Sequence, residues 1–223
     1  MKRIDDLGIN NLKLIQDSDL FCFGTDSVLL TDFAKAKPSD TIADLCTGNG
    51  IIPVLLSAKT KSQKIYGIEL QKASFDLAVQ NMQLNGLEGR VQFINDDVKC
   101  ALNHFKSGSI DVVTCNPPYM APKSGYTNQS NKKAIARHEI AINVYDIIDI
   151  ASKLLKFGGH LYMVHRAERL ADIICTMRDK KIEPKRLQFI HPSPNRAPGL
   201  ILIEGMYGAK PSLRLEQPIY VNI

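Results

Sequence analysis

The stretch that decides the fold is residues 41–50, Thr-Ile-Ala-Asp-Leu-Cys-Thr-Gly-Asn-Gly. Its first six residues, Thr41–Cys46, form a short apolar run that is typical of a buried strand. Gly48 and Gly50 follow, and an apolar helical stretch begins at Ile51. Glycines let the backbone approach a ligand closely, and the N-terminus of the next helix presents unpaired N–H groups. The stretch therefore predicts a strand, a turn that can bind a ligand, and a helix.

Strands and helices continue to alternate on both sides of this turn. Strands separated by helices imply βαβ units, a mostly parallel sheet and right-handed crossovers, with helices on both faces. The last two predicted strands have no helix between them, so we expect them to pair antiparallel. After the first strand, the predicted strands are Lys64–Glu69, Arg90–Asn95, Ile110–Cys115, His160–His165, Arg186–Ile190 and Leu200–Gly205; helices are predicted from Ile51 and over Gln71–Asn85, Ile142–Phe157 and Ala167–Lys180.

The residues before the first strand predict a small N-terminal extension. Leu12–Gln16 and Leu20–Phe23 are expected to form a hairpin. Thr25 is expected to cap a helix over Asp26–Lys35, which Pro38 ends. Residues 1–38 would then form an extension, and residues 39–223 one α/β domain.

The composition excludes several classes of protein. The chain has 223 residues, of which 44% are hydrophobic and 23% charged, so it is neither disordered nor of low complexity. It lacks both an apolar run long enough to cross a membrane and a secretory h-region. Its five cysteines form no C-x-x-C pair, and its five histidines have no metal-ligand spacing. We expect a cytoplasmic protein without a metal or a membrane partner.

The charge is distributed unevenly along the chain. Residues 1–150 contain 16 Lys or Arg and 17 Asp or Glu, whereas residues 151–223 contain 12 and 6. A basic C-terminal third raises the expectation of a polyanionic partner such as RNA, although a solvated basic surface is an equally simple explanation. The candidate phosphate contacts are Lys132, Lys133, Arg137, Lys180, Lys181, Lys185, Arg186 and Arg196.

A carboxylate lies at the right distance from the glycine turn to bind a ribose. Glu69 follows Gly48 by 21 residues and ends the second predicted strand. An acid at this place suits the two hydroxyls of a ribose. The third position of a dinucleotide fingerprint is occupied by Pro53, which argues against NAD or FAD. The turn and the acid together favour a different ribose-bearing cofactor.

The tetrapeptide Asn116-Pro-Pro-Tyr119 follows the fourth predicted strand directly. Ligands of open parallel sheets bind beyond the carboxyl ends of the strands, where the glycine turn, Glu69 and this tetrapeptide are all expected. Two prolines would hold the Asn116 carboxamide and the Pro117 carbonyl in fixed positions, and Tyr119 offers a flat face on which a base could stack. A simple surface turn is the alternative.

With these three features, the chain resembles class I S-adenosylmethionine-dependent methyltransferases that modify planar amino or amide nitrogens. Further stretches resemble one bacterial group, the tRNA(Val) adenine-37 N6-methyltransferases. The resemblance implies a Rossmann-like, mostly parallel seven-stranded sheet of order 3-2-1-4-5-7-6, S-adenosylmethionine as cofactor and tRNA as partner. The further stretches are Phe23–Leu30, Ala136–Glu139, His165–Leu170 and Glu183–Arg186 with His191-Pro192.

The resemblance also implies roles for individual residues at the cofactor site. Asp44, Gly48 and Gly50 would line the methionine part of the cofactor, and Glu69 would bind its ribose. Asp97, or its neighbour Asp96, would reach the adenine. The segment Phe23–Ser27 would cover the methionine end, which places Thr25 and Asp26 near the cofactor. Cys46 departs from the pattern, since glycine is often found there in this group.

The resemblance gives the tetrapeptide a catalytic role that needs no general base. The Asn116 side-chain oxygen and the Pro117 carbonyl would each accept one N–H bond from the adenine amino group, and Tyr119 would stack on the extracted base.

Two other functions remain open. The first is methylation of a glutamine in a release factor; the enzymes that do this carry a helical domain ahead of the core, for which the 40 residues before the glycine turn leave no room. The second is a non-catalytic RNA-binding protein of the same fold.

Overall fold

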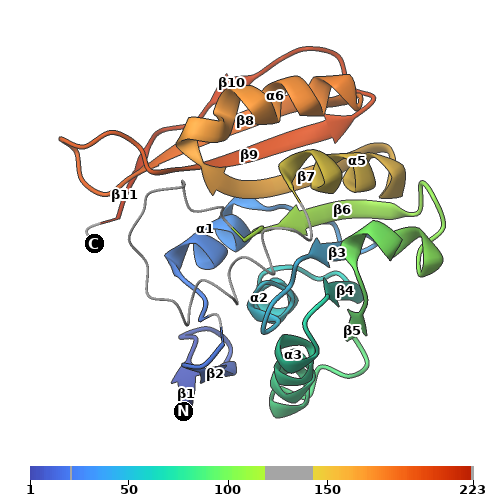
Figure 1. The fold of residues 1–223 in the computed structure, drawn as a ribbon, viewed down its shortest axis with the longest axis vertical. Coiled ribbons are helices and arrows are strands. Elements are labelled where there is room, and N and C mark those ends of the chain that lie inside the picture. Colours follow the sequence, from blue (N-terminus) through green and yellow to red (C-terminus); the bar gives the residue numbers. More distant parts are fainter. Residues whose placement is uncertain (21, 119–142, 222–223) are drawn as a thin grey trace, which may run out of the picture.

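The computed structural model describes residues 1–20, 22–118 and 143–221. A twisted sheet forms its centre, with helices on both faces (Figure 1). The strands are β1 (Lys2–Asp6), β2 (Lys13–Asp17), β3 (Thr41–Leu45), β4 (Lys64–Glu69), β5 (Val91–Asn95), β6 (Ile110–Cys115), β7 (Leu155–Arg166), β8 (Ile182–His191), β9 (Leu200–Tyr207), β10 (Arg214–Leu215) and β11 (Ile219–Tyr220). The helices are α1 (Thr25–Phe33), α2 (Ile51–Lys59), α3 (Lys72–Leu84), η1 (Val98–Asn103), α5 (Val144–Leu154), η2 (Ala167–Arg169) and α6 (Leu170–Asp179).

The order of the central strands confirms the predicted topology. The sheet runs β10-β8-β9-β7-β6-β3-β4-β5, which contains the order 3-2-1-4-5-7-6 when the seven predicted strands are numbered along the chain. β9 is antiparallel to both β7 and β8, as the missing helix between the last two strands predicts. The short strands β10 and β11, which were not predicted, pair parallel with the outer edge of β8.

Alternating side chains of the central strands build a separate core on each face of the sheet. Ile42 of β3 packs in one cluster with residues of α1, α2 and α3, whereas its neighbour Ala43 packs in the other with residues of α5 and α6. The central strands are therefore apolar on both sides, which is why they follow one another as nearly continuous apolar runs in the sequence.

The N-terminal hairpin exists, but its second predicted strand was wrong. β2 pairs antiparallel with β1, which precedes it, so that Lys2 lies opposite Asp17; residues 20–23 form no described strand. Asn10 and Asn11 adopt positive φ angles in the connecting turn. β1 was missed because most of its residues are exposed, so it carries charges and shows no apolar alternation.

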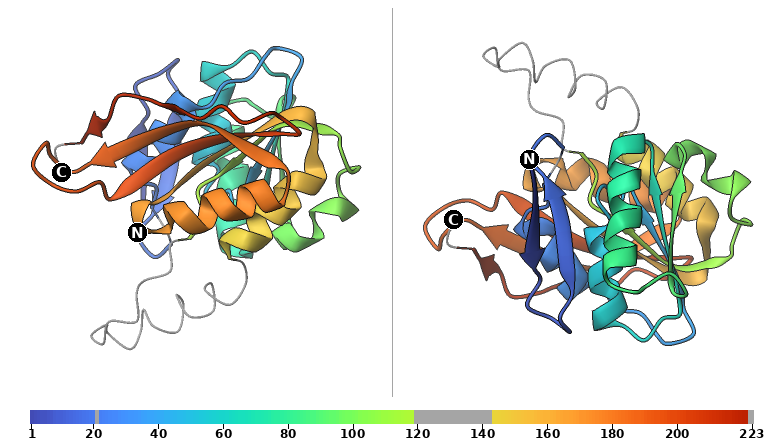
Figure 2. Two further views of the ribbon diagram at one scale, coloured as in Figure 1. Left: turned by 90° about the horizontal axis from the view of Figure 1, so that it is seen from above. Right: turned by 90° about the horizontal axis from the view of Figure 1, so that it is seen from below.

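The hairpin is held against the main domain by two asparagines, Asn81 of α3 and Asn85 directly after this helix. The buried Asn81 accepts a bond from the Ile15 amide and donates to the Ile15 carbonyl, and Asn85 makes the same pair of bonds with Lys13. Asn81 also donates to the carbonyl of Asn49 in the glycine turn. The hairpin lies alongside α3 (Figure 2). These bonds link the extension to the turn on which the cofactor prediction rests.

Two predicted boundaries were also wrong. Thr25 is not the helix cap: α1 begins at Thr25 itself, and the capping position belongs to Gly24, which has no side chain to bond. The helix predicted over 142–157 ends at Leu154, and β7 begins at once, because a bulge at Gly158, with φ of 80°, lets the strand pass through the two glycines.

Candidate active site

The predicted site residues meet at one edge of the sheet. β3, β4 and β6 are parallel neighbours, so the glycine turn, Glu69 and Asn116, which follow or end these strands, lie at their common carboxyl edge. β7 and β8 also end there, because each is antiparallel to β9. Ligands of open parallel sheets bind at this edge.

Gly48 and Gly50 both adopt positive φ angles, but the space around them differs. Gly50 has φ of 82°, and a Cβ there would lie 2.6 Å from Phe93 Cζ. Gly48 has φ of 58°, but a Cβ there would meet no atom within 4 Å, so this part of the turn faces open space. Cys46 also has a positive φ of 61°, the conformation in which glycine carries no steric penalty.

Glu69 braces this turn from the end of β4. Its carboxylate is largely buried and accepts a hydrogen bond of 2.8 Å from the Gly48 amide through Oε2. Through Oε1 it accepts a second bond, also of 2.8 Å, from the Gln71 amide. The 21-residue spacing therefore corresponds to a direct contact, which places a negative charge against the open side of the turn.

Asp44 lies behind the turn. Its side chain is fully buried, and it accepts hydrogen bonds from the hydroxyls of Thr47, at 2.6 Å, and Thr114, at 2.7 Å. Burial raises the pKa of Asp44 to about 7 against the lowering effect of these two bonds, with a further upward contribution from the charge of Glu69. Asp44 therefore ties the turn to β6.

The raised pKa predicts a pH-dependent stability that Asp44→Asn removes. Folded protein binds the Asp44 proton more tightly than unfolded protein, so this contribution is complete below pH 4 and is lost as the pH rises toward 7 and above. The difference in the free energy of unfolding between wild type and Asp44→Asn should fall by up to about 1.4 kcal/mol per pH unit between pH 4 and 7. Urea denaturation of both proteins from pH 5 to 8 measures this, and parallel curves would contradict the assignment.

Asn116 is oriented by the first turn of α1. Its Nδ2 donates to Asp26 Oδ2, at 3.1 Å, and to Ser27 Oγ, at 2.9 Å. Asp26 Oδ1 accepts a bond from the Ser27 amide. These two bonds hold the carboxamide of Asn116 in one orientation, with its Nδ2 toward α1. Ser27 lies within the Phe23–Leu30 stretch, but no role was predicted for it, and only the fold brings it to Asn116.

The two candidate acids after β5 are both engaged within the chain. Asp97 caps η1, because its Oδ1 accepts a bond from the Lys99 amide. Asp96 Oδ2 lies 2.7 Å from His104 Nε2, and this bond is the main reason that the pKa of Asp96 is lowered. Asn95 donates to the carbonyl of Glu69, which ties this loop to the end of β4.

The predicted basic residues that the structure describes do not lie together. Lys180 and Lys181 precede β8 at the edge opposite the site, whereas Arg196 follows β8 at the site edge. Lys180 pairs with Asp149 at 2.8 Å, and Lys185 bonds Ser212. Tyr119, Lys132, Lys133 and Arg137 lie outside the described residues.

Arg186 takes part in an internal charge network. It pairs with Glu204 and Glu216, each at 3.0 Å, and its guanidinium stacks on the ring of Phe33. The sequence could not distinguish a cation that is paired within the fold from one that is exposed to a partner.

In residues 1–20, 22–118 and 143–221, no group of three His, Cys, Asp or Glu side chains could hold a metal ion. No helix of that part of the chain is long and apolar enough to cross a membrane.

Comparisons with known proteins agree with this geometry. The model of the methyltransferase small domain family matches residues 12–178. A tRNA1(Val) (adenine(37)-N6)-methyltransferase of Histophilus somni is 27% identical over 150 residues, which are 67% of this chain and 62% of that protein. A protein of the same name from Porphyromonas gingivalis is 27% identical over 187 residues, 81% of this chain and 72% of the relative. The chain thus spans less than two thirds of the length of the first of these relatives.

A solved structure shows the same fold. The predicted O-methyltransferase of Agrobacterium tumefaciens superposes with a TM-score of 0.68 and 18% identity, covering 88% of this chain and 87% of that chain.

Proposed function

The chain belongs to the methyltransferase small domain family, and from this premise we propose that it transfers the methyl group of S-adenosylmethionine to N6 of an adenine in tRNA. The name shared by its relatives favours adenine 37, next to the anticodon of a valine tRNA. The observation that carries the proposal is the fixed carboxamide of Asn116 at the carboxyl edge of the sheet, beside the glycine turn. As a tRNA-modifying enzyme it would work in the cytoplasm.

The residues present fit this cofactor. The open side of Gly48 and the adjoining Glu69 carboxylate suit a ribose, whose hydroxyls donate to an acid. We propose that Gly48 and Gly50 line the cofactor, that Asp97 reaches its adenine, and that Thr25 and Asp26 of the extension, residues 1–38, cover its methionine end. Asp44 is fully buried, so it would act on the cofactor through the turn that it supports. When bound, the cofactor supplies an electrophilic methyl group.

The chain's own part in the reaction is to hold the amino group of the base. The lone pair of an adenine amino nitrogen is delocalised into the ring, which makes it a poor nucleophile. If Asn116 Oδ1 and the Pro117 carbonyl each accept one N–H bond, the nitrogen turns toward tetrahedral geometry and its lone pair becomes available. Tyr119 would stack on the base after it leaves the RNA stack. The proton lost afterwards can pass to solvent, so no basic side chain is required.

We propose RNA contacts for the basic residues. Their positions relative to the site edge and their ion pairs favour some of these contacts over others. Arg196 lies at the site edge and is the best placed of those described. Lys132, Lys133 and Arg137 belong to the stretch between Pro118 and Asn143 and are retained as proposals. The ion pairs of Lys180 and Arg186 favour structural roles, and Lys181 and Lys185 precede or begin β8, away from the site edge.

Asp26 should position Asn116, and Asp26→Asn tests this. The variant replaces the charged acceptor of the Asn116 bond, so we expect kcat for methyl transfer to fall about tenfold while KM for RNA stays the same. Asp32→Asn on the same helix is the matched control, because Asp32 pairs with Lys59 and is largely exposed. Equal kcat values for the two variants would show that the Asp26 bond has no role in catalysis.

The proposed function is tested by offering radiolabelled S-adenosylmethionine with unmodified bulk tRNA and, separately, with recombinant release factor. We expect label in N6-methyladenosine after the RNA is digested to nucleosides. Label in release factor would overturn the substrate. Label in neither acceptor, with the cofactor bound, would favour a non-catalytic RNA-binding protein.

A further inference from the structure

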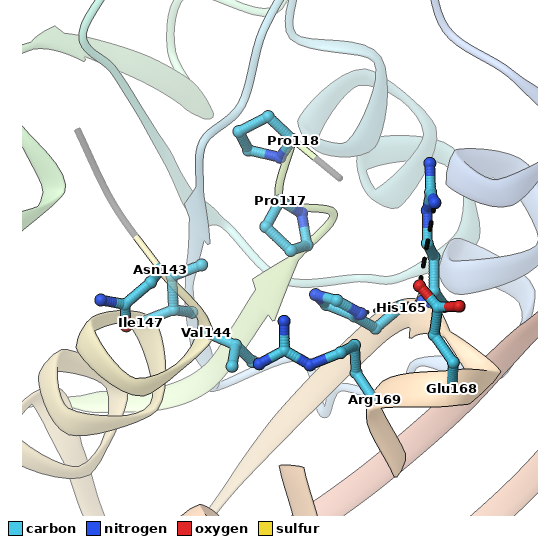
Figure 3. Close-up of a pocket in the computed structure, with 9 residues that line it drawn as sticks. Pro117, Pro118, Asn143, Val144, Ile147, His165, Glu168 and Arg169 are labelled. Atoms are coloured by element: carbon cyan, nitrogen blue, oxygen red, sulfur yellow. Dashed lines mark hydrogen bonds and ion pairs between the residues drawn. The ribbon is translucent and has the colours of Figure 1, made fainter. Parts of the chain in front are cut away.

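A pocket lies beside the tetrapeptide at the site edge, between the ends of β6 and β7 and the start of α5 (Figure 3). Pro117 forms part of its wall, so the pocket adjoins the carbonyl that is proposed to hold the target base. Its other walls include Asn143 and Val144 at the start of α5 and His165, Arg166 and Arg169 at the end of β7. None of these polar side chains is used by the mechanism above.

Arg169 supplies the more accessible of the two positive charges that line the pocket. Its side chain is 37% exposed, and it pairs with Asp172 through Nε at 2.8 Å. Because this ion pair is made through Nε, it does not use the two Nη groups of the planar guanidinium. Figure 3 shows the guanidinium lying between Val144 and His165, on the side of the pocket that faces Pro117. Two adjacent N–H donors on a planar fork match two oxygens of one phosphate.

Two arginines, Arg169 and Arg166, and one acid, Glu168, are the charged side chains that line the pocket. Arg166 is a second guanidinium in its wall. Glu168 pairs with Arg166 at 3.8 Å, and its side chain is 64% exposed. Burial, with the charges of Arg169 and Arg166, lowers the pKa of His165 to about 4, so His165 is neutral at pH 7 and adds no charge. The N-terminus of α5, an 11-residue helix, adds the positive end of its dipole.

We propose that this pocket binds a backbone phosphate of the RNA next to the target adenosine, with Arg169 as the principal contact and Arg166 as the second. The proposal rests on the proposed function, because a base that is drawn out of its stack toward Asn116 brings its flanking phosphates to the edge of the site. Phosphate contacts fix the position and register of an RNA without reading its sequence. The site would hold the RNA strand while Asn116 and Pro117 hold the base.

Direct RNA binding tests the pocket without requiring methyl transfer. A fluorescent anticodon stem-loop is titrated with wild type, Arg169→Met, Arg169→Lys and Arg178→Met, at several salt concentrations. Arg178 lies on α6 near the opposite edge of the sheet and pairs with Glu183, so its variant is a matched control for loss of one arginine charge. Thermal unfolding shows whether each variant keeps the stability of wild type.

Arg169→Met should weaken RNA binding about tenfold and reduce the slope of log K against log salt by about one phosphate contact. Arg169→Lys should restore the salt slope but only part of the affinity, because an ammonium group lacks the planar fork. Arg178→Met should bind as wild type does, and S-adenosylmethionine affinity should be unchanged in all variants.

Three outcomes would overturn the proposal. Equal RNA affinity of Arg169→Met and Arg178→Met would show that the pocket holds no phosphate, even if wild type methylates tRNA. A loss of cofactor affinity in Arg169→Met would assign the pocket to the cofactor instead. Absence of RNA binding by wild type would overturn the pocket and the tRNA substrate together, whereas binding without methyl transfer would overturn only the proposed activity.

Discussion

Asn116→Ala is expected to reduce kcat for methyl transfer at least about 100-fold, which is the usual effect of removing one preorganised hydrogen-bonding group from a reacting centre. The proposed acceptor is the side-chain oxygen of Asn116, whose carboxamide is held in one orientation because Nδ2 donates to Asp26 and Ser27. Alanine removes this acceptor without touching the glycine turn or Glu69, so the Kd for S-adenosylmethionine should stay within about twofold. Single-turnover kinetics and titration calorimetry measure the two quantities.

The control for this variant is Asn103→Ala, which removes an exposed asparagine at the end of η1. Its kcat should match wild type. If Asn116→Ala lost cofactor affinity as strongly as activity, Asn116 would belong to the cofactor site and the proposed hold on the amino group would be wrong.

Glu69→Ala is expected to weaken S-adenosylmethionine binding about 100-fold, since hydrogen bonds to a charged acceptor each contribute about 1.5–3 kcal/mol. The carboxylate holds the Gly48 and Gln71 amides, so alanine removes both the proposed ribose acceptor and the brace of the turn. Titration calorimetry gives the Kd, and kcat at saturating cofactor should fall much less than kcat/KM.

Two further variants make this result specific to the site. Glu69→Gln keeps one side-chain oxygen as acceptor, so its affinity should lie between those of wild type and Glu69→Ala. Glu88→Ala removes an exposed acid from the loop before β5 and should bind as wild type does. Wild-type affinity in Glu69→Ala would remove Glu69 from the cofactor site.

The sequence predicts the sheet well because its signal is local. Each central strand is buried on both faces and therefore follows as one apolar run, and a helix between two runs implies a parallel crossover. Residues at the carboxyl ends of such strands must meet at one edge, so the sequence predicts that the glycine turn and Glu69 lie at the same edge. The hydrogen bond of 2.8 Å from the Gly48 amide to Glu69 was not predicted. β1, by contrast, is exposed and charged, and it carries no such signal.

The sequence does not predict contacts between distant segments with the same success. Asp26 and Asn116 are 90 residues apart, and only the fold, in which α1 packs against α2 and β7, brings them to 3.1 Å. Basic residues show the same limit, because a count of charges does not distinguish Arg186, paired with two glutamates, from Arg169, which lies in a pocket. Ion pairing is a property of the fold, so the candidate RNA contacts had to be separated by structure.

We propose that Asn116 and Pro117 hold the amino group of one tRNA adenine for methylation. Unmodified valine tRNA transcripts with adenine or guanine at position 37 test it directly, with labelled S-adenosylmethionine and separation of the nucleosides after digestion. We expect label in N6-methyladenosine from the adenine transcript and none from the guanine transcript. Equal label in both transcripts, or label in a nucleoside other than N6-methyladenosine, would contradict it.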